Sequence, residues 1–296
     1  MSSKYHIPIL LSESLTFLGI DKGKKYVDAT LGGGGHSLAI AKLGASVLGI
    51  DTDHEAVNFV KNEMQNIKVE LQNKIVLTKG NFRDVKEIAE ANEFSKVDGV
   101  LFDLGVSSNQ LDKAERGFSF MKDGPLDMRM NSDLEVMASD LVHGLSKKEL
   151  VTLFRRFGEE RYANIIAGSI VKNRQKSSLK TTKQLADLIV ATIGRRQGDI
   201  HPATLVFQAL RIAINDELNS IELGLNGALE IIKSKGKIVV ITFHSLEDKI
   251  VKQKFSLFAD SGIGIVLTKK PIIPKQAEIN NNPRSRSAKL RVFEKN

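Results

Sequence analysis

The stretch of sequence that decides the fold is Asp28-Ala29-Thr30-Leu31-Gly32-Gly33-Gly34-Gly35-His36-Ser37. The apolar pattern at residues 25–30 predicts a short strand, and a helical pattern follows at 37–43. Glycines between a strand and a helix let the backbone approach a ligand closely, and the helix N-terminus offers N–H groups to it. The stretch therefore predicts a ligand site at the carboxyl end of a first strand.

Strand and helix patterns alternate after this stretch. Further strands are predicted at 46–51, 74–78 and 97–103, with helices at 55–65 and 84–92 between them. Short apolar strands separated by helices of about ten residues are typical of a parallel sheet covered on both faces. The predicted fold class is α/β.

The alternation stops after the fourth strand, and residues 105–225 show helical patterns without a convincing strand. Ser146 and Glu149 match a capping box, and Gly158 is a helix stop. Another helix opens at Thr181 or Thr182, and Pro202 suits the first position of a third.

The C-terminal third returns to the sheet pattern. A buried strand is predicted at 236–243 and a helix at 247–258, and segments 264–268 and 287–293 can pair as an antiparallel hairpin. We therefore expect a sheet domain formed by residues 1–105 and 226–296, interrupted by a helical insertion at 106–225. Such an insertion leaves the carboxyl edge of the sheet, where ligands bind, and suits substrate recognition. A purely structural or dimerising role is the alternative.

Acidic residues around the glycines indicate a nucleoside-containing cofactor. Asp51 ends the second strand, where a carboxylate can accept both hydroxyls of a ribose. Asp28 precedes the glycines, an arrangement common in S-adenosylmethionine sites and unfavourable to a pyrophosphate. A dinucleotide fingerprint lacks its third glycine, because Ser37 or Leu38 stands there, and a P-loop is excluded by the absence of its motif. A glycine-rich turn without a ligand is the remaining alternative.

Two further strand ends point to the same edge of the sheet. Phe82 follows the third strand and can place its ring beside an adenine, and Asp103 ends the fourth strand. Each residue alone is compatible with ordinary capping or packing. Four strand ends that converge on one edge favour a binding site.

Composition excludes several classes of protein. The 296 residues are 42% hydrophobic and 26% charged, as in ordinary globular proteins, and include no Cys, so disulfides, thiolate metal sites and a cysteine nucleophile are excluded. No run of about 18 apolar residues predicts a membrane span. The N-terminus shows no export signal, so we expect a cytoplasmic protein.

The net charge of +8 is concentrated near the C-terminus. Residues 269–296 hold eight basic and two acidic residues, which leaves +2 for the preceding 268. A basic segment of this kind attracts a phosphate backbone, and a solubilising tail is the alternative. Trp is absent and only three Tyr occur, so the composition does not indicate base-stacking aromatic residues.

Several motifs, in order from about His6 to Val292, resemble those of the bacterial small-subunit ribosomal RNA cytosine-N4 methyltransferases, the RsmH or MraW family. Besides the glycine stretch, the motifs are Asp103-Leu104-Gly105-Val106-Ser107-Ser108, Arg116-Gly117-Phe118-Ser119-Phe120, Gly124-Pro125-Leu126-Asp127-Met128-Arg129-Met130, His201-Pro202-Ala203-Thr204, Phe207-Gln208-Ala209-Leu210-Arg211, Phe243-His244-Ser245-Leu246-Glu247-Asp248 and Arg286-Ser287-Ala288-Lys289-Leu290-Arg291.

The resemblance implies a class I, Rossmann-like methyltransferase sheet with a helical insertion. It implies transfer of a methyl group from S-adenosylmethionine to N4 of one cytidine in the decoding region of 16S ribosomal RNA. This RNA is the expected partner, and the sequence leaves open whether it is bound within the small ribosomal subunit or as free RNA. The cofactor contacts that it implies are Gly34, Gly35, His36, Asp51, Phe82, Asp103 and Gln110. Two positions depart from the family pattern: Asn109 replaces a proline and Lys249 an arginine, and neither is an expected cofactor contact.

Methyl transfer to an amine needs an in-line geometry and an acceptor for the amine hydrogens. We expect Asp103 to contribute as the catalytic acceptor, with His244 as the other candidate, although His244 also suits a capping role. No metal site is expected. The sequence leaves the oligomeric state open, and a homodimer is compatible with it.

Two other classes of function compete with this interpretation. A nicotinamide-dependent oxidoreductase shares the strand–helix–strand unit and the acidic residue, and a non-catalytic RNA-binding protein needs only the basic segment.

Overall fold

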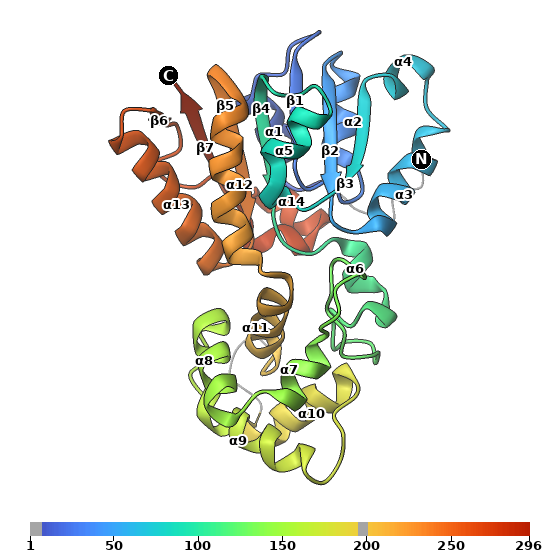
Figure 1. Ribbon diagram of the computed structural model, residues 1–296, viewed down its shortest axis with the longest axis vertical. Helices are drawn as coiled ribbons and strands as arrows, with labels where there is room; N and C mark the ends of the chain where they lie inside the picture. The colour runs from blue at the N-terminus through green and yellow to red at the C-terminus, as the bar shows by residue number, and fades with distance from the viewer. Residues whose placement is uncertain (1–7, 195–200) are drawn as a thin grey trace. The chain divides into compact units, whose positions relative to one another are not determined.

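The computed structural model describes residues 8–194 and 201–296, which divide into two compact units (Figure 1). One unit consists of residues 1–107 and 218–296 and contains the sheet, and the other consists of residues 108–217. The sequence analysis placed residues 218–225 in the insertion, whereas the structure groups them with the sheet.

The sheet has seven strands in the order β3-β2-β1-β4-β5-β7-β6. The strands are β1 (Lys25–Asp28), β2 (Ser46–Asp51), β3 (Ile75–Lys79), β4 (Val97–Asp103), β5 (Ile232–Thr242), β6 (Gly264–Val266) and β7 (Lys289–Lys295). Strands β1 to β5 pair in parallel, and β7 runs antiparallel to both β5 and β6. The predicted α/β class and the closing antiparallel hairpin are confirmed.

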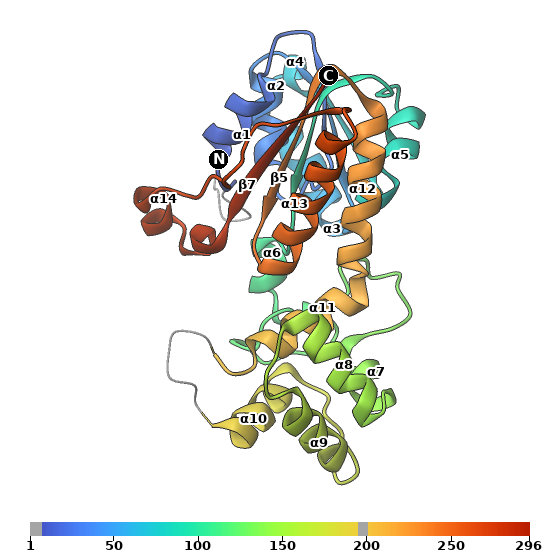
Figure 2. The ribbon, with the colours of Figure 1, turned by 90° about the vertical axis from the view of Figure 1, so that its left-hand side faces the viewer.

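Helices of this unit cover both faces of the sheet (Figures 1 and 2). They are α1 (Leu11–Leu18), α2 (Gly35–Lys42), α3 (His54–Met64), α4 (Val69–Gln72), α5 (Val85–Ala91), α12 (Glu217–Ile231), α13 (Ser245–Asp260) and α14 (Gln276–Asn281), with 3-10 turns η1 (Phe82–Asp84) and η3 (Pro283–Ser287). Alternate residues of β4 belong to different cores: Val100 and Phe102 pack with α5, α12 and α13, and Leu101 packs with α1 and α2. This alternation follows from the two-residue period of a strand that is buried on both faces.

Helix α12 explains the shifted boundary. It is continuous from Glu217 to Ile231, and its residues Ile221, Leu225 and Ala228 are buried in the core beside the sheet. Its apolar face therefore belongs to the sheet unit, and the predicted boundary between residues 225 and 226 falls inside this helix.

The second unit is helical within its described residues, apart from an isolated bridge between Pro125 and Thr181. Its elements are α6 (Ser108–Asp112), η2 (Ala114–Arg116), α7 (Ala138–Gly144), α8 (Lys147–Gly158), α9 (Ala163–Arg174), α10 (Thr182–Ile193) and α11 (Thr204–Asn215). The capping box at Ser146 and the helix start at Thr181 are confirmed.

The predicted helix stop at Gly158 is confirmed, since α8 ends there and is followed by the C-cap residue Glu159, which has a φ of 52°. Two details of the sequence prediction were wrong. Pro202 lies outside α11, since a turn closed by the Thr204 N–H and the His201 carbonyl at 3.0 Å precedes the helix. Strand β5 begins at residue 232, before the predicted 236, because the chain re-enters the sheet through an irregular register opposite Val97 and Gly99.

Among the described residues, no helix has both the length and the apolar character needed to cross a bilayer.

The basic C-terminal segment is partly structural. Arg291, on β7, is 5% exposed and donates to both oxygens of Asp248 at 2.6 and 3.1 Å. Burial raises the pKa of Asp248, but Arg291 and Lys289 outweigh it and bring the pKa below its ordinary value. Lys295 donates to the carbonyls of Leu229 and Ile232. These basic side chains hold the end of the sheet together, so only part of the segment's charge faces solvent.

We expect Arg291→Ala to lower the free energy of unfolding by about 3 kcal/mol, because Asp248 then keeps a poorly solvated charge without its main partner. Chemical denaturation monitored by circular dichroism measures the change. Lys270→Ala, at an exposed position of the same segment, is the matched control and changes stability by less than about 0.5 kcal/mol. Equal stability of the two variants would contradict this account of Arg291.

Candidate active site

Three carboxylates lie at the carboxyl ends of neighbouring parallel strands. Asp28 ends β1, Asp51 ends β2 and Asp103 ends β4, and β1 lies between the other two strands. Open parallel sheets bind their ligands at this edge. The structure thus brings together residues that are up to 75 positions apart in the sequence.

The glycine loop has almost no space for side chains. Gly34 has a φ of 74°, and a Cβ there would lie 2.9 Å from a methyl carbon of Val60. A Cβ on Gly35 would lie 2.9 Å from the ring of Pro8. Glycine is required at both positions, since larger residues would displace the turn that leads into α2.

The Asp51 carboxylate is oriented by two backbone groups. One oxygen accepts from the Gly32 N–H at 2.7 Å, and the other accepts from the Asp53 N–H at 2.8 Å. The first bond joins the glycine loop to the end of β2. The carboxylate is therefore held in a fixed orientation next to the glycines.

A threonine joins the loop to Asp103. The Thr30 hydroxyl oxygen accepts from the Asp103 N–H at 2.6 Å. The Asp103 carboxylate also lies 3.7 Å from Nδ1 of His36, within ion-pairing distance when the imidazole is protonated. Both side chains are less than a tenth exposed. His36 and Asp103, selected from separate motifs, thus face each other.

The Asp28 carboxylate is buried at the carboxyl end of β1, between the strand ends that carry Asp51 and Asp103. It is 1% exposed and accepts from the Ser37 hydroxyl at 2.7 Å, which joins β1 to α2. Burial, with a smaller contribution from the negative charges of Asp103 and Asp51, raises the pKa of Asp28 to about 7. The carboxyl group changes its charge near neutral pH.

Phe82 lies beside the same sheet edge in η1. Its ring meets Phe102 edge to face at a centroid distance of 5.8 Å. A Cβ on Gly224 of α12 would lie 2.9 Å from the Phe82 ring, so this helix packs closely against it. The ring is half-buried and held from two sides, which suits a flat apolar ligand group.

Gln110 belongs to the other unit. It is 5% exposed within α6. The other six predicted cofactor residues all lie in the sheet unit.

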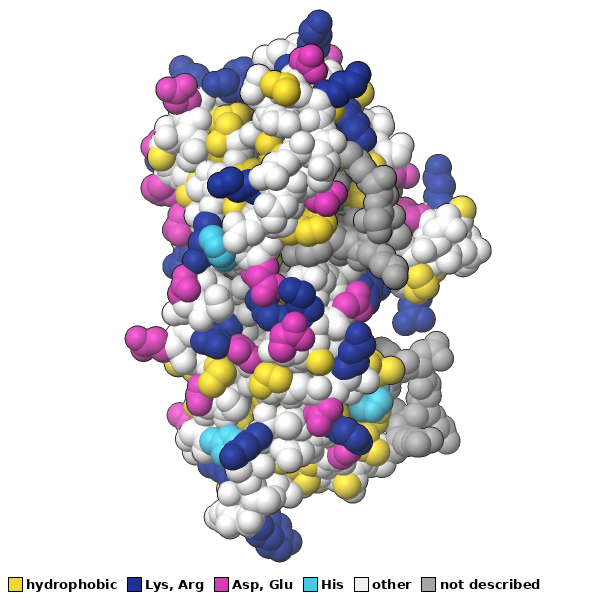
Figure 3. Space-filling model, turned by 90° about the vertical axis from the view of Figure 1, so that its right-hand side faces the viewer, with side chains coloured by type: hydrophobic (Ala, Val, Ile, Leu, Met, Phe, Trp, Pro, Cys, Tyr) yellow, Lys and Arg dark blue, Asp and Glu magenta, His cyan; other side chains and the backbone are white. Residues whose placement is uncertain are grey.

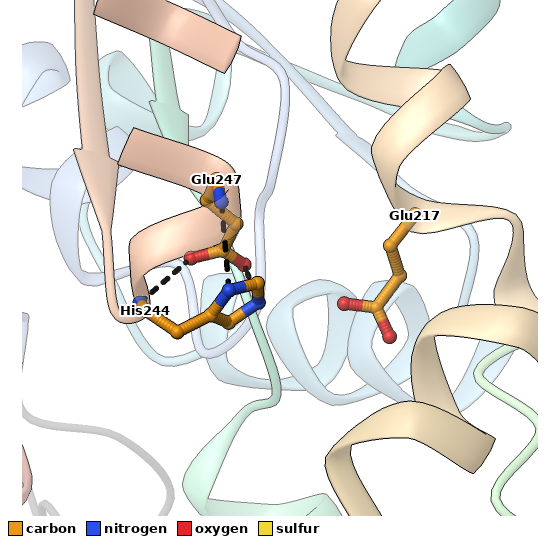
Figure 4. A group of neighbouring side chains, drawn as sticks. All are labelled: Glu217, His244 and Glu247. Atoms are coloured by element: carbon orange, nitrogen blue, oxygen red, sulfur yellow. Dashed lines mark hydrogen bonds and ion pairs between the residues drawn. The ribbon is translucent and has the colours of Figure 1, made fainter. Parts of the chain in front are cut away.

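His244 caps helix α13. Its Nδ1 accepts from the Glu247 N–H at 3.4 Å, while the Glu247 carboxylate accepts from the His244 N–H (Figure 4). The same carboxylate also accepts from the Phe243 N–H. This is a reciprocal capping box at the end of β5. The capping role anticipated for His244 is present, and it accounts for the local geometry of this residue.

The sequence analysis missed the segment before α1, whose Pro8 packs against Gly35 of the glycine loop. Leu10 has a φ of 51°, is fully buried, and donates its N–H to the Glu278 carboxylate at 2.7 Å. Glu278 lies on α14, 268 residues further along the chain. No local pattern marks such a long-range contact. Thr30 and Ser37, by contrast, lie within the glycine motif, where polar residues beside Asp28 were a usable signal.

Comparison with known proteins decides between the enzyme classes that this edge of the sheet can serve. The model of the MraW methylase family matches residues 3–296. The chain belongs to the MraW methylase family. The predicted enzyme class, a methyltransferase, and the predicted methyl donor, S-adenosylmethionine, follow from this membership.

Relatives of this MraW family member are similar over almost their whole length. The ribosomal RNA small subunit methyltransferase H of Coprothermobacter proteolyticus is 44% identical over 98% of this chain and 96% of its own. That of Carboxydothermus hydrogenoformans is also 44% identical, over 98% of this chain and 97% of its own. A solved rRNA methylase from Streptococcus thermophilus aligns with a TM-score of 0.48 at 11% identity over 98% of each chain, and the family assignment does not depend on it.

The raised pKa of Asp28 has a consequence for the stability of this methyltransferase. The unfolded chain loses the proton near the ordinary pKa of 3.8, whereas the folded chain keeps it to about pH 7. The folded state therefore binds more protons in this window, and its stability falls as the pH rises through it.

We expect the wild type to lose on the order of 1–4 kcal/mol relative to Asp28→Asn between pH 4 and pH 8, because the amide carries no charge to bury. Urea denaturation of both proteins across this range measures the difference. A stability difference that is independent of pH would show that the Asp28 carboxyl keeps its ordinary pKa.

Proposed function

We propose that this enzyme transfers a methyl group from S-adenosylmethionine to N4 of a cytidine in 16S ribosomal RNA. The observation that carries the proposal is the 44% identity to ribosomal RNA small subunit methyltransferases H over 96–97% of their length. Identity at this level, spread over both units, supports a shared substrate as well as a shared fold. A ribosomal substrate also fits the cytoplasmic location expected from the sequence.

The residues at the sheet edge fit S-adenosylmethionine. The backbone of Gly34 and Gly35 contacts its methionine part, and the turn that presents this backbone requires glycine, since a Cβ at either position would meet Val60 or Pro8. Asp51, already oriented by two N–H groups, accepts the ribose hydroxyls, and the Phe82 ring packs against the adenine. His36, Asp103 and Gln110 complete the proposed contact set.

The cofactor supplies an electrophilic methyl group on a sulfonium, and the protein supplies orientation and an acceptor. The cytosine N4 lone pair is delocalised into the ring, so an acceptor on an amine hydrogen makes the nitrogen more nucleophilic. We assign this role to Asp103, whose backbone is held by Thr30 and whose carboxylate faces His36. The new bond from N4 to the methyl carbon would replace the bond from that carbon to the sulfonium sulfur, which would leave as the neutral thioether of S-adenosylhomocysteine, and the Asp103 carboxylate would accept the proton that the nitrogen loses.

A nicotinamide-dependent oxidoreductase does not fit the family assignment, and a purely RNA-binding role leaves the buried carboxylates at the sheet edge without a function.

RNA binding is still required of the methyltransferase. The exposed basic residues of the C-terminal segment that can serve it are Lys269, Lys270, Lys275, Arg284 and Arg286. On the face shown in Figure 3, Lys and Arg are interspersed with Asp and Glu, so charge alone does not define an RNA path there. We propose the insertion as the domain that recognises the RNA around the target.

We expect Asp51→Ala to weaken S-adenosylmethionine binding by about 1–3 kcal/mol, because the ribose hydroxyls lose a charged acceptor. Isothermal titration calorimetry measures this, and NAD should show no binding. Asp21→Ala removes an exposed carboxylate that pairs only locally with Lys24, and serves as the control. Unchanged affinity in Asp51→Ala would remove Asp51 from the proposed site.

We expect the purified wild type to form N4-methylcytidine in 16S RNA, within small subunits or as free RNA, and Asp103→Asn to be about 10²- to 10⁴-fold slower, because the amide cannot take the proton. Nucleoside mass spectrometry after nuclease mapping measures product and position. Methylation of a carbon or of another base by the wild type would refute the proposed target, and a full rate in Asp103→Asn would refute the role of Asp103.

A further inference from the structure

We propose that Phe120 and His201 form a stacking platform for one unpaired base of the RNA substrate. The platform lies within the unit formed by residues 108–217. The proposal rests on the proposed RNA substrate and adds a binding site for a base, separate from the cofactor residues of the sheet unit.

The two rings are already stacked in the structure. Their centroids are 4.4 Å apart, with 26° between the ring planes. His201 is exposed to solvent, whereas Phe120 is half-buried. The imidazole thus forms the outer layer of a stack whose inner layer is a phenyl ring.

The stack has a fixed support. The Phe120 ring meets the buried Phe207 of α11 edge to face, with centroids 4.9 Å apart. Nδ1 of His201 accepts from the Ala203 N–H at 3.2 Å, which orients the imidazole at the start of the same helix. Three rings from two separate segments are therefore held in order before any ligand arrives, so little conformational entropy remains to be lost on binding.

The loop that carries Phe120 is anchored on the side of α10. The Thr182 N–H donates to the Gly124 carbonyl at 2.9 Å, and the Thr182 hydroxyl donates to the Lys122 carbonyl at 3.2 Å. A Cβ on Gly124 would lie 1.9 Å from the Ala114 carbonyl oxygen, so the loop crosses the preceding turn at close range. Such packing fixes the backbone around Phe120.

Exposure and ring chemistry together indicate the ligand. Met121, the residue after Phe120 in the sequence, is 82% exposed, so the same loop also presents an apolar side chain to solvent. Packing within the protein needs neither an exposed imidazole on the outside of the stack nor an exposed methionine on this loop. Single-stranded RNA is read by stacking its splayed bases on Phe, Tyr, Trp and His, and a methyltransferase that acts on a base amino group needs an unpaired target region.

NMR of His201 in the full-length protein tests the contact directly. The probes are a single-stranded heptaribonucleotide of cytidines and uridines and an abasic ribose-phosphate chain of the same length. With ring-labelled histidine, the His201 ring proton signals, assigned from the His201→Ala spectrum, should move upfield with the base-bearing RNA. They should stay in place with the abasic chain, because only a base adds a ring current.

Binding measurements separate stacking from charge. We expect His201→Ala to bind the heptaribonucleotide about tenfold more weakly, with an unchanged slope of log affinity against log salt, since stacking releases no counterions. His201→Phe should retain affinity within about twofold. Tyr162→Ala, which removes an exposed aromatic ring elsewhere in the same unit, is the control.

The possible results have distinct meanings. If the wild type binds the RNA but the His201 signals stay in place and His201→Ala binds equally well, the platform is refuted and the proposed function stands. If His201→Phe is as weak as His201→Ala, stacking is refuted in favour of a contact specific to imidazole. If the wild type binds neither the heptaribonucleotide nor 16S RNA, the proposed function and the platform fail together.

Discussion

The hydrogen bond between the buried Asp28 carboxyl and the Ser37 hydroxyl is the contact on which the cofactor edge depends. It joins the end of β1 to the first turn of α2, and the four glycines span the distance between them. With these ends fixed, the Gly32 N–H reaches Asp51, and the Thr30 hydroxyl reaches the backbone of Asp103. A carboxyl group is retained at this buried position although burial opposes its charge, because it orients the loop from inside the sheet.

The two units of the chain meet different demands. The sheet unit needs apolar strands buried on both faces, so that polar residues are left mainly at strand ends, where catalytic and binding groups collect. In its described residues, 108–194 and 201–217, the helical unit has no sheet edge to supply a site, and its rings come from a loop and from the start of α11. A methyltransferase that must hold both a small cofactor and a large polymer benefits from this separation, because each surface can be shaped independently.

Several predictions succeeded because local physics determines the answer. The bounds of β2 and β4 match the sequence pattern. The capping box at Ser146 and a threonine N-cap, Thr181, begin their helices as predicted, since a hydroxyl that accepts a backbone N–H acts within one turn. The start of β5, the boundary of the sheet unit at the start of α12 and the true role of Arg291 were missed. Each depends on what a residue packs against. In the sequence, Arg291 is counted among the charges of a basic C-terminal segment, whereas in the structure it lies buried against Asp248.

The sequence by itself determined the α/β class, the glycine loop with its carboxylates at Asp28, Asp51 and Asp103, and the family, because strand periodicity, turn chemistry and motif order are local properties of the chain. Only the tertiary structure decided that His36 faces Asp103, that Glu278 of α14 accepts from the Leu10 N–H, and that Phe120 and His201 stack. Those contacts join residues between 67 and 268 positions apart, and such pairs are selected by the packing of whole elements, which no local pattern encodes.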